Sequence, residues 1–232
     1  NGMIDYRNLK YSLVQQIIET PIVSVAGVVP VAQKYQIQLN LLNNFKKDGY
    51  KVVLIGTGEL NELMGAYSLG DVLFCRDLPE VHRIHYFNNF LKEIEKRDKP
   101  DVIIIGIDDP LLSLSSRHPF NYGIYATELY SAFSPDISII ALMNGNYNDD
   151  FYDEFGKLCR FKYNIDASAY FVSRYVSLSA SMYREKLSYA YSSEIQNLSE
   201  KYTVFSNSDI EQRNIYDFVL SRLQQYGRCE QF

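Results

Sequence analysis

"TPIVSVAGVVPVAQKYQIQLNLLNNFKKDGYKVVLIG" (20–56) decides the fold that we expect for this chain. Its apolar run at 22–26 has the length and composition of a buried strand, and "YKVVLIG" at 50–56 has the same character. Between them, apolar residues recur at helical spacing from about residue 34 to 48, and Gly49 follows where a helix C-cap favours a positive φ. The stretch therefore predicts a strand, a loop, a helix and a second strand.

The rest of the chain continues this alternation of strands and helices. Residues 101–107, "DVIIIGI", are apolar almost throughout, as a central parallel strand covered on both faces should be. Other expected elements are helices at 4–18, 79–97, 122–133, 150–161 and 209–226, and strands at 71–75, 136–142 and 202–205.

Such alternation implies βαβ units with right-handed crossovers. We therefore expect an α/β fold with a doubly wound, mostly parallel sheet, similar to those of P-loop NTPases and Rossmann proteins. The chain would consist of an N-terminal helix within residues 1–19 and one P-loop-NTPase-like α/β domain at 20–232, whose C-terminal third is less regular. Ligands on such sheets bind outside the carboxyl ends of the strands.

Composition narrows the class of protein further. The chain has 232 residues, of which 47% are hydrophobic and 22% charged, so one sizeable core is feasible. Its net charge of -5 argues against nucleic acid as a partner, and it lacks the long apolar run of a membrane span. The three cysteines are far apart and fit neither a disulfide framework nor a zinc motif. These features favour a cytoplasmic protein with free thiols.

The loop before the first long helix departs from the phosphate-binding motif G-x-x-x-x-G-K-[ST]. In that motif the second glycine admits the phosphates, the lysine reaches them, and the final hydroxyl holds Mg²⁺. Here Gln33 replaces the glycine, Tyr35 follows Lys34, Gly27 lies one position too early, and Pro30 removes a backbone donor. A helix N-terminus and one lysine remain, which suffice for weak anion binding.

The sequence thus gives a set of candidate phosphate- or anion-binding residues: Gly27, Gln33, Lys34 and Tyr35. We expect little or no NTP hydrolysis, and no cofactor beyond a weakly bound nucleotide or phosphate. The alternative is an ordinary turn between strand and helix, with Lys34 solvated.

Three further candidates carry weaker signals. Asp108 follows the apolar strand at 101–107, where phosphate-loop enzymes place a metal-assisting acid, but it is equally a loop residue before a proline. Asn144 matches only the first residue of a guanine-binding N-K-x-D motif. His82 and His85 lie three residues apart on an expected helix, yet no third ligand accompanies them, so we predict no metal site.

The irregular C-terminal third is rich in tyrosine, at positions 163, 170, 175, 183, 189 and 191. Tyrosine and arginine are the residues that most often dominate binding energy at interfaces, and Arg174 and Arg184 lie within this stretch. Tyr175 and Tyr183 are therefore candidate interface residues. Alternatively, these tyrosines pack the last helices onto the sheet, as most aromatic residues are largely buried.

Three stretches together resemble one family, the peptide-maturation-system proteins encoded beside radical SAM maturases of ribosomally made peptides. They are "TPIVSVAG…QKYQIQLNLLNNFKKDGYKVVLIGTGE", "KPDVIIIGIDDP" and "FNYGIYATELYSAFSPDISIIAL", and the resemblance extends over roughly residues 20–226. Members of this family resemble P-loop NTPases and often carry a degenerate loop. The resemblance implies an accessory or scaffold role in RiPP biosynthesis, with the radical SAM maturase or the precursor peptide as partner. Apart from the resemblance, a homodimer is a further candidate assembly.

Two other functions stay open at this point. One is a nucleotide-dependent enzyme, an ATPase or GTPase, that uses Lys34 and Asp108. The other is a small-molecule transferase or binding module at the carboxyl ends of the strands. Some family members also have an additional N-terminal domain, whereas this sequence indicates only a short helix before residue 20.

Overall fold

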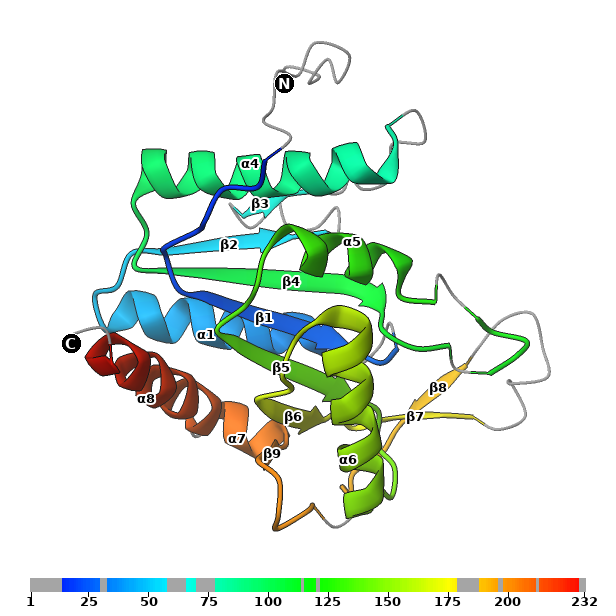
Figure 1. Ribbon diagram of the computed structural model, residues 1–232. Coiled ribbons are helices and arrows are strands. Elements are labelled where there is room, and N and C mark those ends of the chain that lie inside the picture. The colour runs from blue at the N-terminus through cyan, green and yellow to red at the C-terminus, as the bar shows by residue number, and fades with distance from the viewer. Residues whose placement is uncertain are drawn as a thin grey trace.

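The computed structural model describes residues 14–29, 33–57, 66–69, 78–113, 115–119, 122–178, 188–195, 198–211 and 213–229. They form a central parallel sheet between two helical layers, with a small hairpin at one end (Figure 1). The strands of the sheet are β1 (Ile22–Gly27), β2 (Val52–Gly56), β3 (Tyr67–Ser68), β4 (Val102–Pro110), β5 (Ile137–Leu142), β6 (Ala169–Val172) and β9 (Val204–Phe205). The hairpin consists of β7 (Tyr175–Ser177) and β8 (Tyr189–Tyr191).

The seven strands are ordered β3-β2-β4-β1-β5-β6-β9, and every neighbouring pair is parallel. The helices are α1 (Lys34–Lys47), α4 (Glu80–Asp98), α5 (Ile124–Ala132), α6 (Asp149–Leu158), α7 (Asn207–Glu211) and α8 (Asn214–Cys229), and a π-helical turn η2 (Cys159–Tyr163) continues α6. Helices α1 and α8 cover one face of the sheet, and α4, α5 and α6 cover the other (Figure 1). This arrangement confirms the doubly wound α/β fold expected from the sequence.

The strand order reverses between β1 and β4, and this reversal defines the switch point of the sheet. The chain leaves β1 through α1 towards β2, and it leaves β4 through α5 towards β5 in the opposite direction. The two crossover helices therefore cover opposite faces, and a crevice opens at the carboxyl ends of β1 and β4. Both the loop before Lys34 and the acidic residue Asp108 belong to this end of the sheet.

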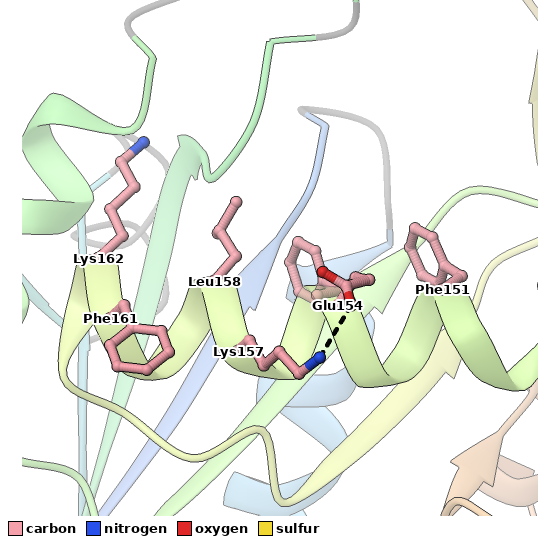
Figure 2. Close-up of a pocket in the computed structure, with 7 residues that line it drawn as sticks. Phe151, Glu154, Lys157, Leu158, Phe161 and Lys162 are labelled. Atoms are coloured by element: carbon pink, nitrogen blue, oxygen red, sulfur yellow. Dashed lines mark hydrogen bonds and ion pairs between the residues drawn. The ribbon is translucent and has the colours of Figure 1, made fainter.

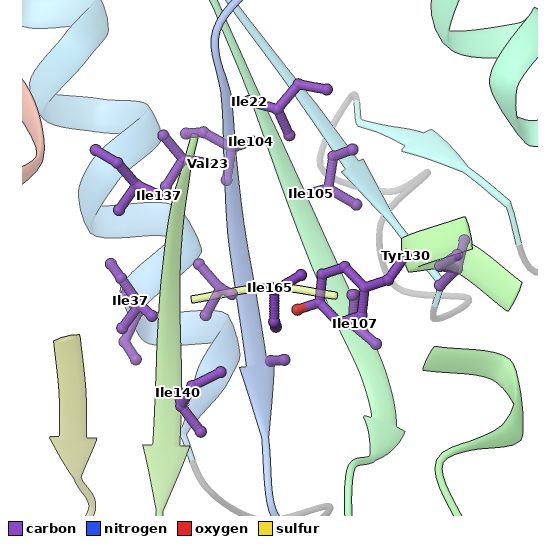
Figure 3. Packing of buried hydrophobic residues seen from close by; sticks show 14 of the residues in the cluster. Ile22, Val23, Ile37, Ile104, Ile105, Ile107, Tyr130, Ile137, Ile140 and Ile165 are labelled. Carbon is purple, nitrogen blue, oxygen red and sulfur yellow. The ribbon is translucent and has the colours of Figure 1, made fainter. Parts of the chain in front are cut away.

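The sheet is buried most completely along its middle strands. Ile103, Ile104 and Ile105 of β4 are inaccessible to solvent, as are Val23 and Val25 of the adjacent β1. Figure 3 shows these strands side by side, with buried isoleucines from the strands and from neighbouring elements packed around them. The expected central strand at 101–107 is thus confirmed, and the structure extends it to Pro110, so that Asp108 and Asp109 lie in a strand rather than in a loop.

The expected N-terminal helix at 4–18 is wrong where the structure describes it, since residues 14–19 contain no helix. This segment is extended and is held by side chains of the outer helices: Gln16 N donates to Asn88 Oδ1 at 2.7 Å, and Asn88 Nδ2 donates to Gln16 O at 2.9 Å. The remainder of that prediction, like the expected strand at 71–75, lies outside the described residues.

The C-terminal third divides into core and surface. Tyr163 and Tyr170 are buried in the main hydrophobic core, as the packing alternative predicted for the tyrosine-rich stretch. Tyr175, Tyr189 and Tyr191 instead form the hairpin β7–β8, where they are half-buried or exposed. The last helix begins at Asn214, because the short helix α7 occupies the first residues of the range expected for it.

Candidate functional site

The candidate site lies in the crevice at the carboxyl ends of β1 and β4. Helix α1 begins here at Lys34, and Gln33 precedes it as the N-cap with a left-handed backbone (φ 57°). The phosphate-loop motif places glycine at this position, and glycine adopts such a φ without steric cost. For Gln33, which is not a glycine, this conformation costs about 1 kcal/mol or more.

The side chain of Gln33 is engaged within the protein. Its Oε1 accepts a hydrogen bond from Arg174 N at 3.0 Å, and its Nε2 donates to Gln36 Oε1 at 2.8 Å. Because Arg174 lies between β6 and β7, these bonds tie the start of α1 to the base of the hairpin. A glycine at position 33 could make neither bond.

Lys34, the first residue of α1, is buried. The residue is only 4% exposed, and its aliphatic chain runs over Gly27, where a Cβ atom would lie 2.8 Å from Lys34 Cδ. Its Nζ donates to the backbone oxygen of Asp108 at 2.6 Å, across the switch point. The alternative of a solvated Lys34 is therefore wrong, and Gly27 is needed to admit the lysine.

Burial also changes the acidity of Lys34. Loss of solvation lowers the pKa of its ammonium group from 10.5 to about 8, while the nearby carboxylates of Asp108 and Asp109 oppose this shift. The group thus loses its proton far more readily than an ordinary lysine. Both acids come from β4, and Asp109 is buried whereas Asp108 is exposed.

Asp108 is held by the neighbouring strand β2 rather than by a metal-binding cluster. Its backbone N donates to Thr57 Oγ1 at 3.0 Å, and the same hydroxyl donates to Asp108 Oδ2 at 3.2 Å. Among the described residues, no group of three or more His, Cys, Asp or Glu side chains could hold a metal ion. Asp108 is therefore positioned next to Lys34, but without the partners of a described metal site.

A cavity of about 500 Å³ opens beside Lys34. Its lining combines the start of α1, the end of β4 and both strands of the hairpin, through Gln33, Lys34, Tyr35, Gln36, Asp108, Tyr175 and Tyr189. Tyr35 contributes a buried hydroxyl that has no hydrogen-bond partner among the described residues. The structure thus brings together Gln33, Lys34, Tyr35, Asp108 and Tyr175 from the sequence candidates, whereas Tyr183 lies outside the described residues.

Three further residues contact the site residues or line the cavity: Gln36, Thr57 and Arg174. None of them belongs to a recognisable sequence motif. Tyr189 was visible in the sequence only as one member of a tyrosine-rich stretch. Asn144, the other loop candidate, supports the hairpin: its backbone N donates to Tyr175 O at 2.8 Å, and its Nδ2 donates to Glu194 O at 2.6 Å. His82 and His85 lie on α4, exposed and half-buried respectively.

A second hollow lies along α6 and η2, on the outer helical layer (Figure 2). It has a volume of about 630 Å³ and an apolar lining that includes Phe151, Leu158 and the 85% exposed Phe161. Glu154 and Lys157 form an ion pair at its rim, with Nζ and Oε1 2.8 Å apart. None of its lining residues comes from the loop before α1.

The altered acidity of Lys34 predicts a particular dependence of stability on pH. Below about pH 8 the buried lysine is charged in the folded chain, and its lowered pKa corresponds to a penalty of about 3 kcal/mol against folding. Because the unfolded chain keeps its proton up to about pH 10.5, this penalty fades between pH 8 and 10.5. Lys34→Met removes it, but loses one hydrogen bond worth about 1 kcal/mol.

The free energy of unfolding of Lys34→Met should therefore be about 2 kcal/mol higher than that of the wild type at pH 7. This difference should vanish as the pH approaches 10.5. Urea unfolding of both proteins at several pH values, followed by circular dichroism, measures the difference. A difference that does not change with pH would contradict the assigned burial of the charged amine.

No protein-family model and no curated protein matches this chain. Several solved structures are similar to it in fold. A plasmid partition protein from Borrelia burgdorferi aligns with a TM-score of 0.48 at 14% identity, over 88% of this chain and 100% of that protein. The MinD cell division protein of Aquifex aeolicus aligns with a TM-score of 0.43 at 18% identity, over 73% of this chain and 74% of that protein.

A DUF1611 family protein from Anabaena variabilis aligns with a TM-score of 0.47 at 12% identity, over 70% of this chain. The aligned part spans about half of that protein's length, at 50%. Identities this low concern the arrangement of strands and helices alone. The strand order and the site by themselves define a doubly wound α/β protein in which the helix at the switch point begins with a buried lysine. Within the described residues, no helix is both long and apolar enough to cross a bilayer.

Proposed function

We propose that this chain is an accessory or scaffold protein of a ribosomal-peptide maturation system, and that its phosphate loop neither binds NTP tightly nor hydrolyses it. The peptide-maturation role rests on the sequence resemblance over residues 20–226. The loss of nucleotide chemistry rests on one structural observation, which is that Lys34 and Gln33 direct their polar groups onto the protein's own backbone.

This observation matters because a nucleotide needs the same groups. A triphosphate must be contacted by the lysine ammonium, which here donates to Asp108 O, and by a loop that approaches it without side chains. It would also bring several negative charges next to Asp108 and Asp109, the acids that already act on Lys34.

Saturating ATP or GTP with Mg²⁺ should leave the melting temperature unchanged. A ligand at 100 times its dissociation constant stabilises a fold by about 2.7 kcal/mol, which for a chain of this size is roughly 5–11 °C. Differential scanning fluorimetry with millimolar nucleotide, together with a phosphate-release assay, checks both parts of the proposal. A clear shift that Lys34→Ala abolishes would show a working nucleotide site and overturn the proposal.

The hairpin β7–β8 is the surface that we assign to the partner, a radical SAM maturase or its precursor peptide. Tyr175 and Tyr191 face each other across the two strands with ring centroids 5.8 Å apart, and Arg174 lies over the Tyr191 ring and donates to its hydroxyl at 2.9 Å. Tyr191 is 58% exposed. A preordered cluster of tyrosine and arginine at the surface is the composition that binding hot spots favour.

Tyr175→Ala should weaken binding of the neighbouring maturase or precursor peptide at least tenfold, a typical loss for a hot-spot aromatic residue. Co-purification and a titration with the isolated partner measure this loss. Tyr122→Ala is the control for an exposed tyrosine elsewhere, because Tyr122 is 55% exposed and precedes α5 rather than lying on the hairpin. Equal losses for both variants, or a fall in melting temperature of Tyr175→Ala alone, would contradict this surface.

A small-molecule binding module is the second candidate function, and the cavity of about 500 Å³ beside Lys34 favours it. A cavity of this size with aromatic walls and a few polar groups is typical of small-ligand sites. The two functions are compatible, because the cavity and the exposed edge of the hairpin share Tyr175.

A further inference from the structure

Lys34 combines two features that rarely occur together in one side chain. It is buried to 4% exposure, yet it forms part of the wall of a cavity that also contains Tyr35, Tyr175 and Tyr189. Its chain is fixed over Gly27, so the nitrogen has a defined position. A small molecule that enters the cavity therefore meets the side chain of Lys34, whose amine must exchange or share its bond to Asp108 O in order to react.

The hydrogen bond of Lys34 is compatible with loss of its proton. Nζ donates to the carbonyl oxygen of Asp108 at 2.6 Å, and a neutral amine retains two N–H groups that can donate in the same way. A carboxylate as direct acceptor would instead hold the charged form. The neutral amine is the nucleophilic form of lysine, and desolvation is a known route to it.

The titratable groups around Lys34 act in both directions. Burial lowers its pKa to about 8, and the two carboxylates of β4 raise it. At pH 7.5 a substantial fraction of the amine is therefore neutral. The groups that face it are Asp108 and Asp109 from β4, Tyr35 from α1, and Tyr175 and Tyr189 from the hairpin.

We propose that Lys34 is a nucleophilic lysine that forms an imine with small aldehydes bound in the cavity beside it. The tyrosine rings of the hairpin favour an aromatic or otherwise flat aldehyde, because they offer faces for stacking. This role is independent of nucleotide chemistry and adds a covalent binding site to the chain.

The reaction needs no oxidant or reductant. The neutral Nζ attacks the carbonyl carbon and forms a C–N bond, which gives a carbinolamine. The C–O bond then breaks, and water leaves with the carbonyl oxygen and both protons of the amine, so that a C=N bond remains. Tyr35 carries a buried hydroxyl without a hydrogen-bond partner among the described residues. We assign it to give its proton to the departing hydroxyl and to regain one from the nitrogen, so that both protons of the water come in sum from the amine.

Reductive trapping tests the proposal directly. The folded protein is incubated with benzaldehyde and sodium cyanoborohydride, which reduces the imine to a stable secondary amine, and the modified lysines are identified by peptide mass mapping. Lys34 should be modified at least tenfold faster than the exposed Lys46, Lys47 and Lys99. Its rate should rise steeply with pH through about 8, where half of the amine is neutral, and level off about one unit higher.

Two variants make the outcome decisive. Lys34→Arg keeps a cation at the site but cannot form an imine, so the fast modification should disappear. Tyr35→Phe should slow the modification of Lys34 several-fold while the exposed lysines react as before. The melting temperature of each variant shows whether it is folded. Modification of Lys34 no faster than that of the exposed lysines, or only in urea, would overturn the proposal.

The same experiment separates this inference from the proposed function. If Mg²⁺-ATP protected Lys34 from benzaldehyde, a nucleotide would reach the site, and the proposal of an inactive loop would fail while the imine chemistry stood. If benzaldehyde failed to label Lys34 and nucleotide caused no thermal shift, the inactive loop would stand and the nucleophilic lysine would be rejected.

Discussion

Ile104→Asp is expected to abolish the folded state at neutral pH. Ile104 lies in the middle of β4, is fully buried, and is paired with β1 on one side and β2 on the other. A carboxyl group at this site would be protonated, because full burial raises the pKa of an acid by up to 3–5 units, and uptake of that proton at pH 7 costs about 4 kcal/mol relative to the ionised unfolded chain. Loss of the isoleucine packing adds about 2–5 kcal/mol. Together these costs match the total stability of most proteins, about 5–15 kcal/mol.

Ile104→Val is the control for this substitution, since it keeps the strand apolar and should cost only about 0.5–1.5 kcal/mol. Soluble yield, circular dichroism and thermal unfolding distinguish the two variants. If Ile104→Asp yielded soluble protein with a melting temperature near that of the wild type, β4 could not be the buried centre of the sheet.

This strand shows why much of the fold could be predicted from the sequence. Residues 102–105 are apolar without alternation, a pattern that requires cover on both faces, and a parallel sheet between helices provides it. Helix α1 was equally legible, because Ile37, Leu41 and Phe45 recur at helical spacing and are all fully buried. Periodicity succeeds where a single burial pattern extends over a whole element.

The N-terminal segment shows where this reasoning fails. Val14, Ile17 and Ile18 are spaced as on a helix, yet Val14 is 75% exposed and Ile17 is 81% exposed. The segment is bound instead through its backbone, by the side chain of Asn88 and by that of Glu95, which accepts from Thr20 N at 2.6 Å. Such bonds join residues more than 70 positions apart, and no local pattern indicates them.

The position of the candidate site could be predicted from the sequence, but the burial of Lys34 and its lowered pKa could not. The loop and Lys34 could be placed at a strand end from the motif alone. The burial of Lys34 depends on Gly27, on Asp108 and on the hairpin that closes the cavity, and these come together only in the folded sheet. Gln33 shows the same limit, because its partner Arg174 lies 141 positions away in the sequence.

Breaking the buried ion pair between α4 and α5 is the second large expected effect. Arg83 and Glu128 are 7% and 4% exposed, and the guanidinium donates to both carboxylate oxygens, from Nε at 2.8 Å and from Nη2 at 2.7 Å. Glu128→Ala leaves the arginine buried without its bidentate partner and with only the distant, exposed Glu80 as counter-charge, which costs about 3–5 kcal/mol. For a chain of this size, the melting temperature should fall by roughly 6–20 °C.

Glu80→Ala is the matched control, because Glu80 contacts the same arginine but is 72% exposed at its side chain and lies 3.6 Å from Nη2. An exposed pair of this kind contributes about 0–1 kcal/mol, so Glu80→Ala should melt close to the wild type. Equal falls in melting temperature for the two variants would show that the contact with Glu128 contributes no more to stability than the exposed contact with Glu80.

The double variant Arg83→Met with Glu128→Leu tests whether the ion pair stabilises the fold more than apolar side chains would. The alternative is that the pair costs free energy only when one of its partners is removed. Replacing both charges by apolar side chains of similar volume is often neutral or stabilising, because neither charge then has to leave water. Arg83 also donates to Leu78 O at 2.6 Å, and losing that bond leaves one carbonyl unpaired, at a cost of about 1–3 kcal/mol. We therefore expect the double variant to unfold at a temperature between those of Glu128→Ala and the wild type. A double variant less stable than Glu128→Ala would contradict this expectation. It would mean that Arg83 stabilises the contact between α4 and α5 chiefly through its bond to Leu78 O and its own packing, and that Glu128 only neutralises the charge of Arg83.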